Sequence, residues 1–302
     1  MSIRFTKSPP AGSMGQTGTV TTDWLGRRVL HYAHQGGARE APSSTLFAFR
    51  QAVDAGADAL EMDVHMTLDG HLVVAHDETI ERTTPAAGRI DLLTLQQLQA
   101  LDFAHWWAPG YDAVTGLEDH HYPLRGRAPA ESALGVALLR EVLTAFPATL
   151  LNFDIKGGRV PYEQELADTL RTYGRADDVI VASFHDKHLR DFRSVAPEIC
   201  TSSALDESYA IAKALSEGST IELAVSLVAL QVPFRFTPEG DTLFDARLVD
   251  AAHARGLAVH VWTINDEAEM CEVIATGVDG IMTDYPRRLQ SVMSRQGVPR
   301  WR

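Results

Sequence analysis

The stretch that decides the fold is ALEMDVHMTLDGHLVVAHD, residues 59–77. Successive side chains of a strand point to opposite faces, so Glu61 and Asp63 point one way and Met62 points the other way, into an apolar layer. Two neighbouring carboxylates repel each other, and burying them without a partner is costly. A hard cation between them removes that cost, so the pattern favours a Mg²⁺ or Ca²⁺ site over a strand that simply faces water.

The segments on either side of this stretch alternate between strand-like and helix-like patterns. Residues 29–33 and 59–76 contain three predicted strands, and helical patterns occur at 46–53, 92–101 and 133–146. Further strands are predicted at 149–155, 179–183, 200–204, 226–232, 258–263 and 280–283, with helices between them. This rhythm predicts parallel strands with right-handed crossovers in an α/β (β/α)₈ TIM barrel. Nine strands are predicted for a barrel of eight, so one belongs to an extra hairpin or an edge.

Two segments depart from the rhythm. Residues 1–28 are rich in Gly, Ser, Thr and Pro, and we expect an arm ahead of a single barrel domain over 29–302. Residues 88–135 form an irregular insertion after the third strand, dense in aromatic residues, His and Gly between 103 and 122. So long an irregular segment is either a lid that serves the site or a surface addition with its own small apolar cluster.

Composition narrows the class of protein. The 302 residues are 45% hydrophobic and 22% charged, as in ordinary soluble proteins. A net charge of -13 argues against nucleic acid as a partner, because such surfaces are basic. No apolar run has the length of a signal-peptide core or a membrane span, so we expect a cytoplasmic protein without stable membrane insertion. The expected partner is a small molecule.

Polar residues gather where the predicted strands end, which is where a TIM barrel builds its active site. These residues are His34, Glu61, Asp63, His76, Asp154, Lys156, Ser183 and Trp262. Each has an ordinary explanation by itself, such as a surface ion pair between Asp154 and Lys156 or a core position for Trp262. Their joint placement favours a functional site.

The charged members of this set suit displacement at phosphorus. Glu61, Asp63 and Asp154 offer three hard carboxylates to one divalent cation, either Mg²⁺ or Ca²⁺. Lys156 adds a fixed positive charge, and the cation and the lysine together would neutralise the phosphoryl oxygens.

Two histidines complete the chemistry. Imidazoles such as those of His34 and His76 ordinarily titrate near neutral pH, and we expect them to do so here. One can take a proton from the attacking hydroxyl or water, and the other can give a proton to the leaving alkoxide. We therefore predict His34 and His76 as the catalytic residues.

At this point the sequence resembles the glycerophosphodiester phosphodiesterase family. The matching stretches run from His34 to Pro286 and are HQGG (34–37), GADALEMDVHMTLDGHLVVAHD (56–77), RTT (82–84), FDIK (153–156), ASFH (182–185), VWTIN (261–265) and GVDGIMTDYP (277–286). The resemblance implies a (β/α)₈ barrel that uses a divalent cation to hydrolyse glycerophosphodiesters to glycerol 3-phosphate and an alcohol. It also implies roles for matched positions: catalysis by His34 and His76, metal binding by Glu61, Asp63 and Asp154, and phosphate binding by Lys156.

Three positions depart from the family pattern. Gln35 stands where the family usually has a phosphate-contacting Arg, so the missing cation would have to come from Arg39 or Arg82. Ser43 replaces a Glu that can join the metal shell, and Asp154 replaces a Glu that is one methylene longer. The candidate phosphate and substrate contacts are therefore Lys156, Arg39, Gln35 and Trp262.

The substrate is left open between three hypotheses. The first is a glycerophosphodiester, attacked by water or by a neighbouring substrate hydroxyl that closes a cyclic phosphate. The second is a lysophospholipase D-like or sphingomyelinase D-like activity, because Asp-x-Lys at 154–156 also resembles the sphingomyelinase D relatives of this barrel; its apolar groove would come from Phe103, Trp106, Trp107 and Tyr111. The third is a barrel that binds phosphodiesters without cleaving them.

Overall fold

The structure is a computed structural model that describes Trp24 and residues 29–234 and 244–299. The predicted arm at 1–28 lies outside the described residues, except for Trp24. The side chain of Trp24 is buried and packs against a cluster inside the barrel that includes Tyr32 and Met282.

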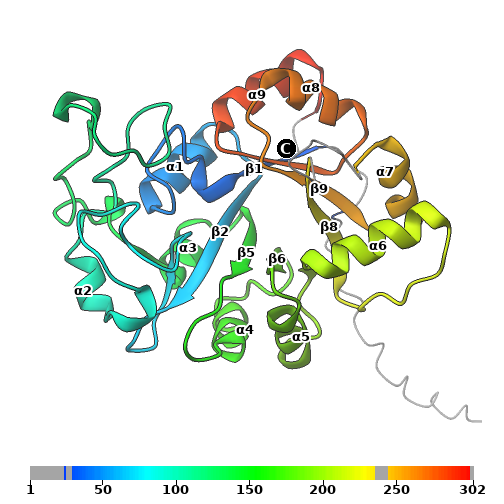
Figure 1. The fold of residues 1–302 in the computed structure, drawn as a ribbon, viewed down its shortest axis with the longest axis horizontal. Coiled ribbons are helices and arrows are strands. Elements are labelled where there is room, and N and C mark those ends of the chain that lie inside the picture. The colour runs from blue at the N-terminus through cyan, green and yellow to red at the C-terminus, as the bar shows by residue number, and fades with distance from the viewer. Residues whose placement is uncertain (1–23, 25–28, 235–243, 300–302) are drawn as a thin grey trace, which may run out of the picture.

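Eight parallel strands close into a barrel, in the order β1-β10-β9-β8-β7-β6-β5-β2, with β1 pairing back to β2 (Figure 1). The predicted TIM barrel is therefore confirmed. The barrel strands are β1 (Leu30–Ala33), β2 (Ala59–Met66), β5 (Leu150–Ile155), β6 (Val179–Ala182), β7 (Thr201–Ser202), β8 (Leu227–Pro233), β9 (Ala258–Trp262) and β10 (Gly280–Thr283).

The ninth predicted strand is an extra hairpin. Strand β3 (Leu72–Val74) turns back at Asp69-Gly70 and pairs antiparallel with β2, so that Val74 lies opposite Val64. A short strand that was not predicted, β4 (Ala137–Leu138), pairs with β3 in turn. The helix predicted at 133–146 is therefore wrong at its start, because residues 137 and 138 are held extended by this pairing and the helix begins at Leu139.

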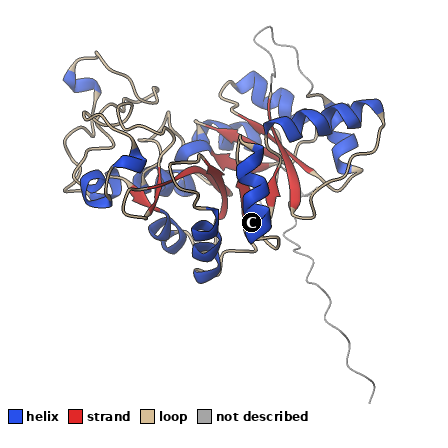
Figure 2. Cartoon of the chain, turned by 60° about the horizontal axis from the view of Figure 1, so that its bottom comes forward, coloured by secondary structure: helices blue, strands red, loops and turns tan. Residues whose placement is uncertain are grey.

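Helices cover the outside of the barrel (Figure 2), while α2 lies in the insertion beside it (Figure 1). Their bounds are α1 (Leu46–Asp54), α2 (Leu95–Gln99), α3 (Leu139–Ala145), α4 (Glu163–Thr172), α5 (Asp186–Val195), α6 (Leu205–Glu217), α7 (Ala246–His253), α8 (Glu267–Ala275) and α9 (Pro286–Arg295). No helix in the described part of the chain is long and apolar enough to cross a membrane.

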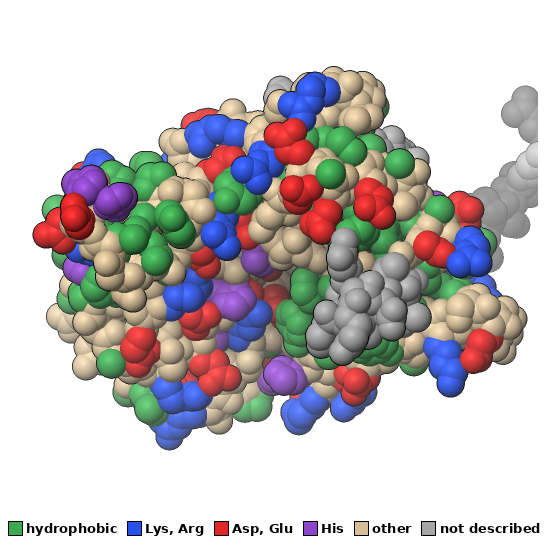
Figure 3. All heavy atoms as spheres, turned by 45° about the horizontal axis from the view of Figure 1, so that its top comes forward, with side chains coloured by type: hydrophobic (Ala, Val, Ile, Leu, Met, Phe, Trp, Pro, Cys, Tyr) green, Lys and Arg blue, Asp and Glu red, His purple; other side chains and the backbone are tan. Residues whose placement is uncertain are grey.

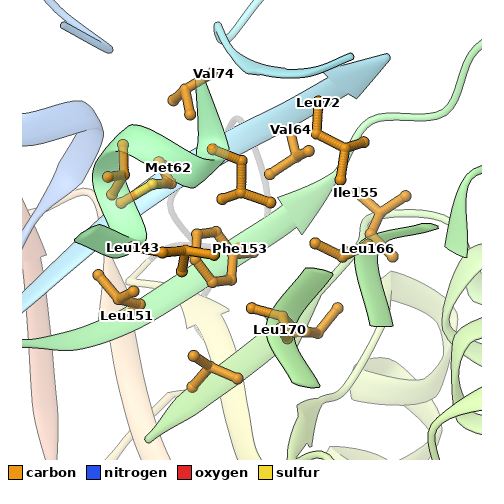
Figure 4. Close-up of a cluster of buried hydrophobic side chains, with 14 of the residues drawn as sticks. Met62, Val64, Leu72, Val74, Leu143, Leu151, Phe153, Ile155, Leu166 and Leu170 are labelled. Carbon is orange, nitrogen blue, oxygen red and sulfur yellow. The ribbon is translucent and has the colours of Figure 1, made fainter. Parts of the chain in front are cut away.

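The alternation in β2 separates the core from the site. Met62 and Val64 point outward and pack in one buried cluster with Phe153 of β5 and Leu166 and Leu170 of α4 (Figure 4). The residues between them, Glu61 and Asp63, therefore point into the barrel. Burying the outer face fixes the register of the strand, because a shift by one residue would expose the whole apolar set.

Candidate active site

A cavity of about 230 Å³ opens at the carboxyl ends of the barrel strands. Its lining includes all eight residues predicted at the strand ends: His34, Glu61, Asp63, His76, Asp154, Lys156, Ser183 and Trp262. In Figure 3, histidine, acidic and basic side chains border one side of a hollow, and hydrophobic side chains border the other. Residues far apart in the sequence thus meet in one place.

The centre of the cavity is an ammonium group between two carboxylates. Asp63 and Asp154 are register partners on β2 and β5. The Lys156 Nζ lies 2.8 Å from Asp63 Oδ1 and 2.7 Å from Asp154 Oδ2. Although burial opposes ionisation, this ammonium holds the pKa of Asp63 below its usual value. The same two carboxylates raise the pKa of Lys156, so the lysine stays charged.

Glu61 lies two residues before Asp63, on the same inward face of β2. Its Oε2 accepts a hydrogen bond of 3.0 Å from the backbone N–H of Gln35. Burial, and then the negative charge of Asp63, raise the pKa of Glu61 to about 7. A carboxylate held this close to protonation gains from any additional cation, because the cation offsets its repulsion from Asp63.

His34 is oriented by a carboxylate from the far end of the chain. Its Nδ1 donates to Asp284 Oδ1 over 2.6 Å, and Asp284 Oδ2 accepts from Asn265 Nδ2 over 2.7 Å. Burial alone would lower the pKa of His34, but the charges of Glu61 and Asp284 raise it to about 9. The bond at Nδ1 leaves Nε2 as the ring nitrogen for proton transfer, 3.9 Å from Glu61 Oε2.

His76 is oriented in the same way. Its Nδ1 donates to Asp77 Oδ1 over 2.6 Å, and Asp77 Oδ2 accepts from Arg82 Nε over 2.6 Å. The hydrogen bond that Asp77 accepts raises the pKa of His76. The site therefore holds two imidazoles, each fixed through Nδ1 by a carboxylate that has its own hydrogen-bond donor.

Two predicted substrate contacts, Gln35 and Arg39, lie outside the cavity lining. Gln35 is buried with a positive φ of 51°, and its Nε2 is 3.4 Å from His34 Nε2. Arg39 points to the insertion, where its Nη1 donates to Gly110 O over 3.3 Å. Arg82 is held by Asp77 and Asp112, so in this conformation neither arginine supplies the missing cation.

Other residues of the site were missed by sequence reasoning. Asp284 follows β10 directly, so the strand-end rule that found the other residues would also have found it. Asn152 precedes Asp154 by two residues on the same strand face, and its Oδ1 accepts a hydrogen bond of 2.6 Å from Gln231 of β8. Phe184, in the loop after β6, and Leu205, the first residue of α6, also line the cavity. Loops and helix starts carry no periodic signal in the sequence.

The predicted apolar groove in the insertion is wrong. Phe103 and Trp107 are buried in apolar clusters of the insertion, and the Trp106 Nε1 donates to Thr84 O over 2.8 Å. Tyr111 is half exposed, and none of the four residues lines the cavity. The apolar wall comes instead from Phe184, Leu205, Pro233 and Trp262, with the rings of Phe184 and Trp262 5.4 Å apart.

The carboxylates suit a divalent cation, although no three His, Cys, Asp or Glu of the described residues are already gathered at metal-binding spacing. Asp63 Oδ2 and Asp154 Oδ1 are buried and accept no hydrogen bond among the described residues. Together with Glu61 they form a set of hard oxygen donors. Lys156 now stands between the two aspartates, so its ammonium would have to move aside for both of them to bind one ion.

Comparisons with known proteins identify chains that this one resembles. Residues 34–288 match the model of the Glycerophosphoryl diester phosphodiesterase family. The chain is 31% identical, over 89% of its length and 100% of the relative, to a glycerophosphodiester phosphodiesterase of Caldanaerobacter subterraneus subsp. tengcongensis. It is 26% identical, over 87% of its length and 86% of the relative, to a lysophospholipase D of Rattus norvegicus. A solved phosphodiesterase from Oleispira antarctica, in complex with sn-glycerol-3-phosphate, is similar with a TM-score of 0.66 and 22% identity, covering 88% of this chain and 97% of that one.

Proposed function

Because the chain belongs to the glycerophosphodiester phosphodiesterase family, we propose that it hydrolyses its phosphodiester with two histidines and a divalent cation. The products are glycerol 3-phosphate and an alcohol. One observation carries the proposal: two histidines, each oriented through Nδ1 by a carboxylate, line one cavity with Glu61, Asp63, Asp154 and Lys156.

The cation, Mg²⁺ or Ca²⁺, would be held by Glu61, Asp63 and Asp154. When bound, it offsets negative charge on the phosphoryl oxygens. The two aspartate oxygens without a hydrogen-bond partner support this assignment. Lys156, displaced from between the aspartates, would remain in the cavity as a second positive charge toward the phosphate.

The histidines move the protons. We assign His34 as the base that takes a proton from the attacking water or substrate hydroxyl, and His76 as the acid that protonates the leaving alkoxide. A cation held by Glu61 and Asp63 would offset the negative charge that raises the pKa of His34, so that this ring could be neutral before it takes the proton. Their fixed Nδ1 bonds support this division, because each ring then presents Nε2 to the cavity in one orientation.

A second candidate substrate is a lysophospholipid. The cavity wall formed by Phe184, Leu205, Pro233 and Trp262 is uncharged and apolar, which favours an acyl-bearing group over a charged one. One of the relatives is a lysophospholipase D. The same histidines and carboxylates would carry out this reaction, with an acyl chain against the apolar wall.

The test is release of glycerol 3-phosphate from glycerophosphocholine, glycerophosphoethanolamine and glycerophosphoglycerol, each with EDTA, Mg²⁺ or Ca²⁺. We expect release that depends on the metal and disappears in His34→Ala. Lysophosphatidylcholine is assayed in parallel for choline release. Hydrolysis of none of these by the folded, metal-supplied protein would contradict the proposal, and equal rates with EDTA would contradict its metal dependence.

A further inference from the structure

A short part of the insertion, residues 107–113, lies against the loops that carry both histidines. We call it the bridging segment. The isolated pairing of Trp107 with Ala113 closes its ends. Figure 1 shows the insertion next to α1, beside the loop that follows β1. None of its residues lines the cavity, so its contacts with the site are indirect.

The first contact is with the loop after β1. Trp107 Nε1 donates to Ala38 O over 3.1 Å. The backbone N–H of Gly110 donates to Arg39 O over 3.0 Å, and Arg39 Nη1 donates back to Gly110 O over 3.3 Å. The bridging segment thus holds the chain four and five residues beyond His34.

The second contact reaches the carboxylate that orients His34. The hydroxyl of Tyr285 donates to Gly110 O over 3.2 Å, and Tyr285 directly follows Asp284. The N–H of Arg39 donates to Asp284 O over 3.2 Å. The loop that bears His34 and the loop that bears Asp284 are therefore hydrogen-bonded to each other, and both are hydrogen-bonded to Gly110 of the bridging segment.

The third contact is on the side of His76. Asp112 Oδ2 accepts from Arg82 Nη1 over 2.7 Å, while Arg82 Nε donates to Asp77 Oδ2 over 2.6 Å. Asp77 Oδ1 in turn holds His76 Nδ1. A continuous chain of charged hydrogen bonds runs from the insertion to the imidazole, and charge-assisted bonds of this length are the stronger kind.

We propose that the bridging segment positions both catalytic histidines, with Asp112 and Arg82 as the positioning residues for His76. The inference depends on the proposed roles of His34 and His76. It assigns the insertion a part in the reaction, through orientation of the acid and the base. This role replaces the two alternatives that the sequence leaves open, a lid and a surface addition. Small misplacements of a reacting group reduce rates strongly, so distant contacts of this kind affect turnover.

The test compares Asp112→Asn with Arg82→Gln by NMR titration of His76, assigned with His76→Ala. The pKa of His76 depends on four neighbouring groups, which are Asp77, Asp63, Lys156 and Arg82. The positive charge of Arg82 lowers this pKa. Arg82→Gln should therefore raise that pKa. Asp112→Asn should lower it, because the guanidinium is then less neutralised. In both variants kcat should fall about tenfold with little change in KM.

The matched control is Asp119→Asn. It breaks an ion pair of 2.7 Å with Arg125 that lies elsewhere in the insertion. We expect this variant to keep the kcat and the His76 pKa of the natural protein. Should Asp112→Asn fail to fold, Tyr285→Phe removes a single hydroxyl from the other contact and should still lower kcat.

The outcomes separate the two proposals. A folded Asp112→Asn protein with an unchanged kcat and an unchanged His76 pKa would overturn the positioning role while leaving the hydrolysis intact. An equal loss of kcat in Asp119→Asn would also overturn it. If the natural protein hydrolyses no phosphodiester, the proposed function fails, and opposite pKa shifts in the two variants would still support the connection from Asp112 to His76.

Discussion

The two halves of the cavity differ in chemistry. All the ionisable lining residues come from the part of the chain before residue 157: His34, Glu61, Asp63, His76, Asp154 and Lys156. The lining residues from Ala182 to Met282, within the described chain, carry no ionisable side chain. We infer that the charged half carries out the reaction at phosphorus and that the neutral half receives an uncharged substituent of the substrate.

A pair of histidines, His34 in the charged half and His260 outside the cavity lining, shows how strongly the surroundings set the charge of this side chain. Carboxylates around His34 raise its pKa to about 9 despite its burial. His260 lies in the barrel on β9, and burial lowers its pKa to about 4. Its Nδ1 lies 3.2 Å from Gln231 Nε2, and the charge of Asp279 offsets only part of the effect of burial. The same type of side chain is therefore a cation at position 34 and neutral at position 260 at pH 7.

The largest expected effect is in the charged half. His76→Ala should lower kcat about 10³-fold on substrates with an alkyl alcohol as leaving group, because the alkoxide then departs unprotonated. A nitrophenyl phosphodiester, whose leaving group needs no proton, should lose far less. Steady-state rates on the two substrates measure the difference, and equal losses on both would exclude His76 as the acid.

A second change weakens the cation site. Glu61→Gln should raise the dissociation constant for Mg²⁺ or Ca²⁺ about 10-fold or more, since a carboxylate ligand becomes neutral. Calorimetric titration measures this directly, without reference to activity. The control is Glu163→Gln, which alters a buried carboxylate 2.6 Å from His188 Nδ1 that does not line the cavity. Unchanged metal affinity in Glu61→Gln would refute the assigned ligand.

A third change tests the neutral half. Leu205 is 38% exposed at the edge of the cavity, and Leu205→Asp places a charge where an acyl chain would lie. We expect kcat/KM for lysophosphatidylcholine to fall about tenfold, with little change for glycerophosphocholine. Val160→Asp, at a residue 58% exposed and outside the cavity, is the control. Equal losses on both substrates would contradict an acyl site here.

The last expected effect is on stability and involves a residue outside the cavity lining. The folded pKa of His260, about 4, lies below the ordinary value of 6.5, so the unfolded chain binds a proton at pH values where the folded protein does not. The free energy of unfolding should therefore fall as the pH drops from 6.5 to 4, by about 3 kcal/mol at most. Urea unfolding across this range measures the slope, and His260→Gln should reduce it. A slope that His260→Gln leaves unchanged would assign the proton uptake to other groups.

The fold was largely predictable, since the alternation of residues in β2 and the strand–helix rhythm determine a parallel barrel. The place of β3 was not predictable, because a short apolar run such as Leu72–Val74 has the same sequence pattern whether it forms a hairpin strand or a barrel strand. Only the antiparallel pairing with β2 distinguishes them.

The positions of side chains near the site were predictable on strands and unreliable in loops. Glu61 and Asp63 point inward because strands have a period of two. The loop after β1 turns sharply at Gln35, Gly36 and Gly37, which all have positive φ, and this carries Arg39 away from the cavity. In the insertion, Phe103 and Trp107 pack in two separate apolar clusters and Trp106 packs against Tyr122. Composition cannot separate such packing from the wall of a groove.

The closure of the barrel has a consequence for the protein during its synthesis. β1 pairs with β10, and the bond between His34 and Asp284 spans this seam between the first and the last barrel strand. A ribosome that has made the chain through Lys156 has already supplied every ionisable residue of the cavity. His34, the proposed base, nonetheless lacks its orienting carboxylate until residue 284 has emerged and β10 has docked. Nascent chains should therefore remain inactive until almost the whole barrel has been translated.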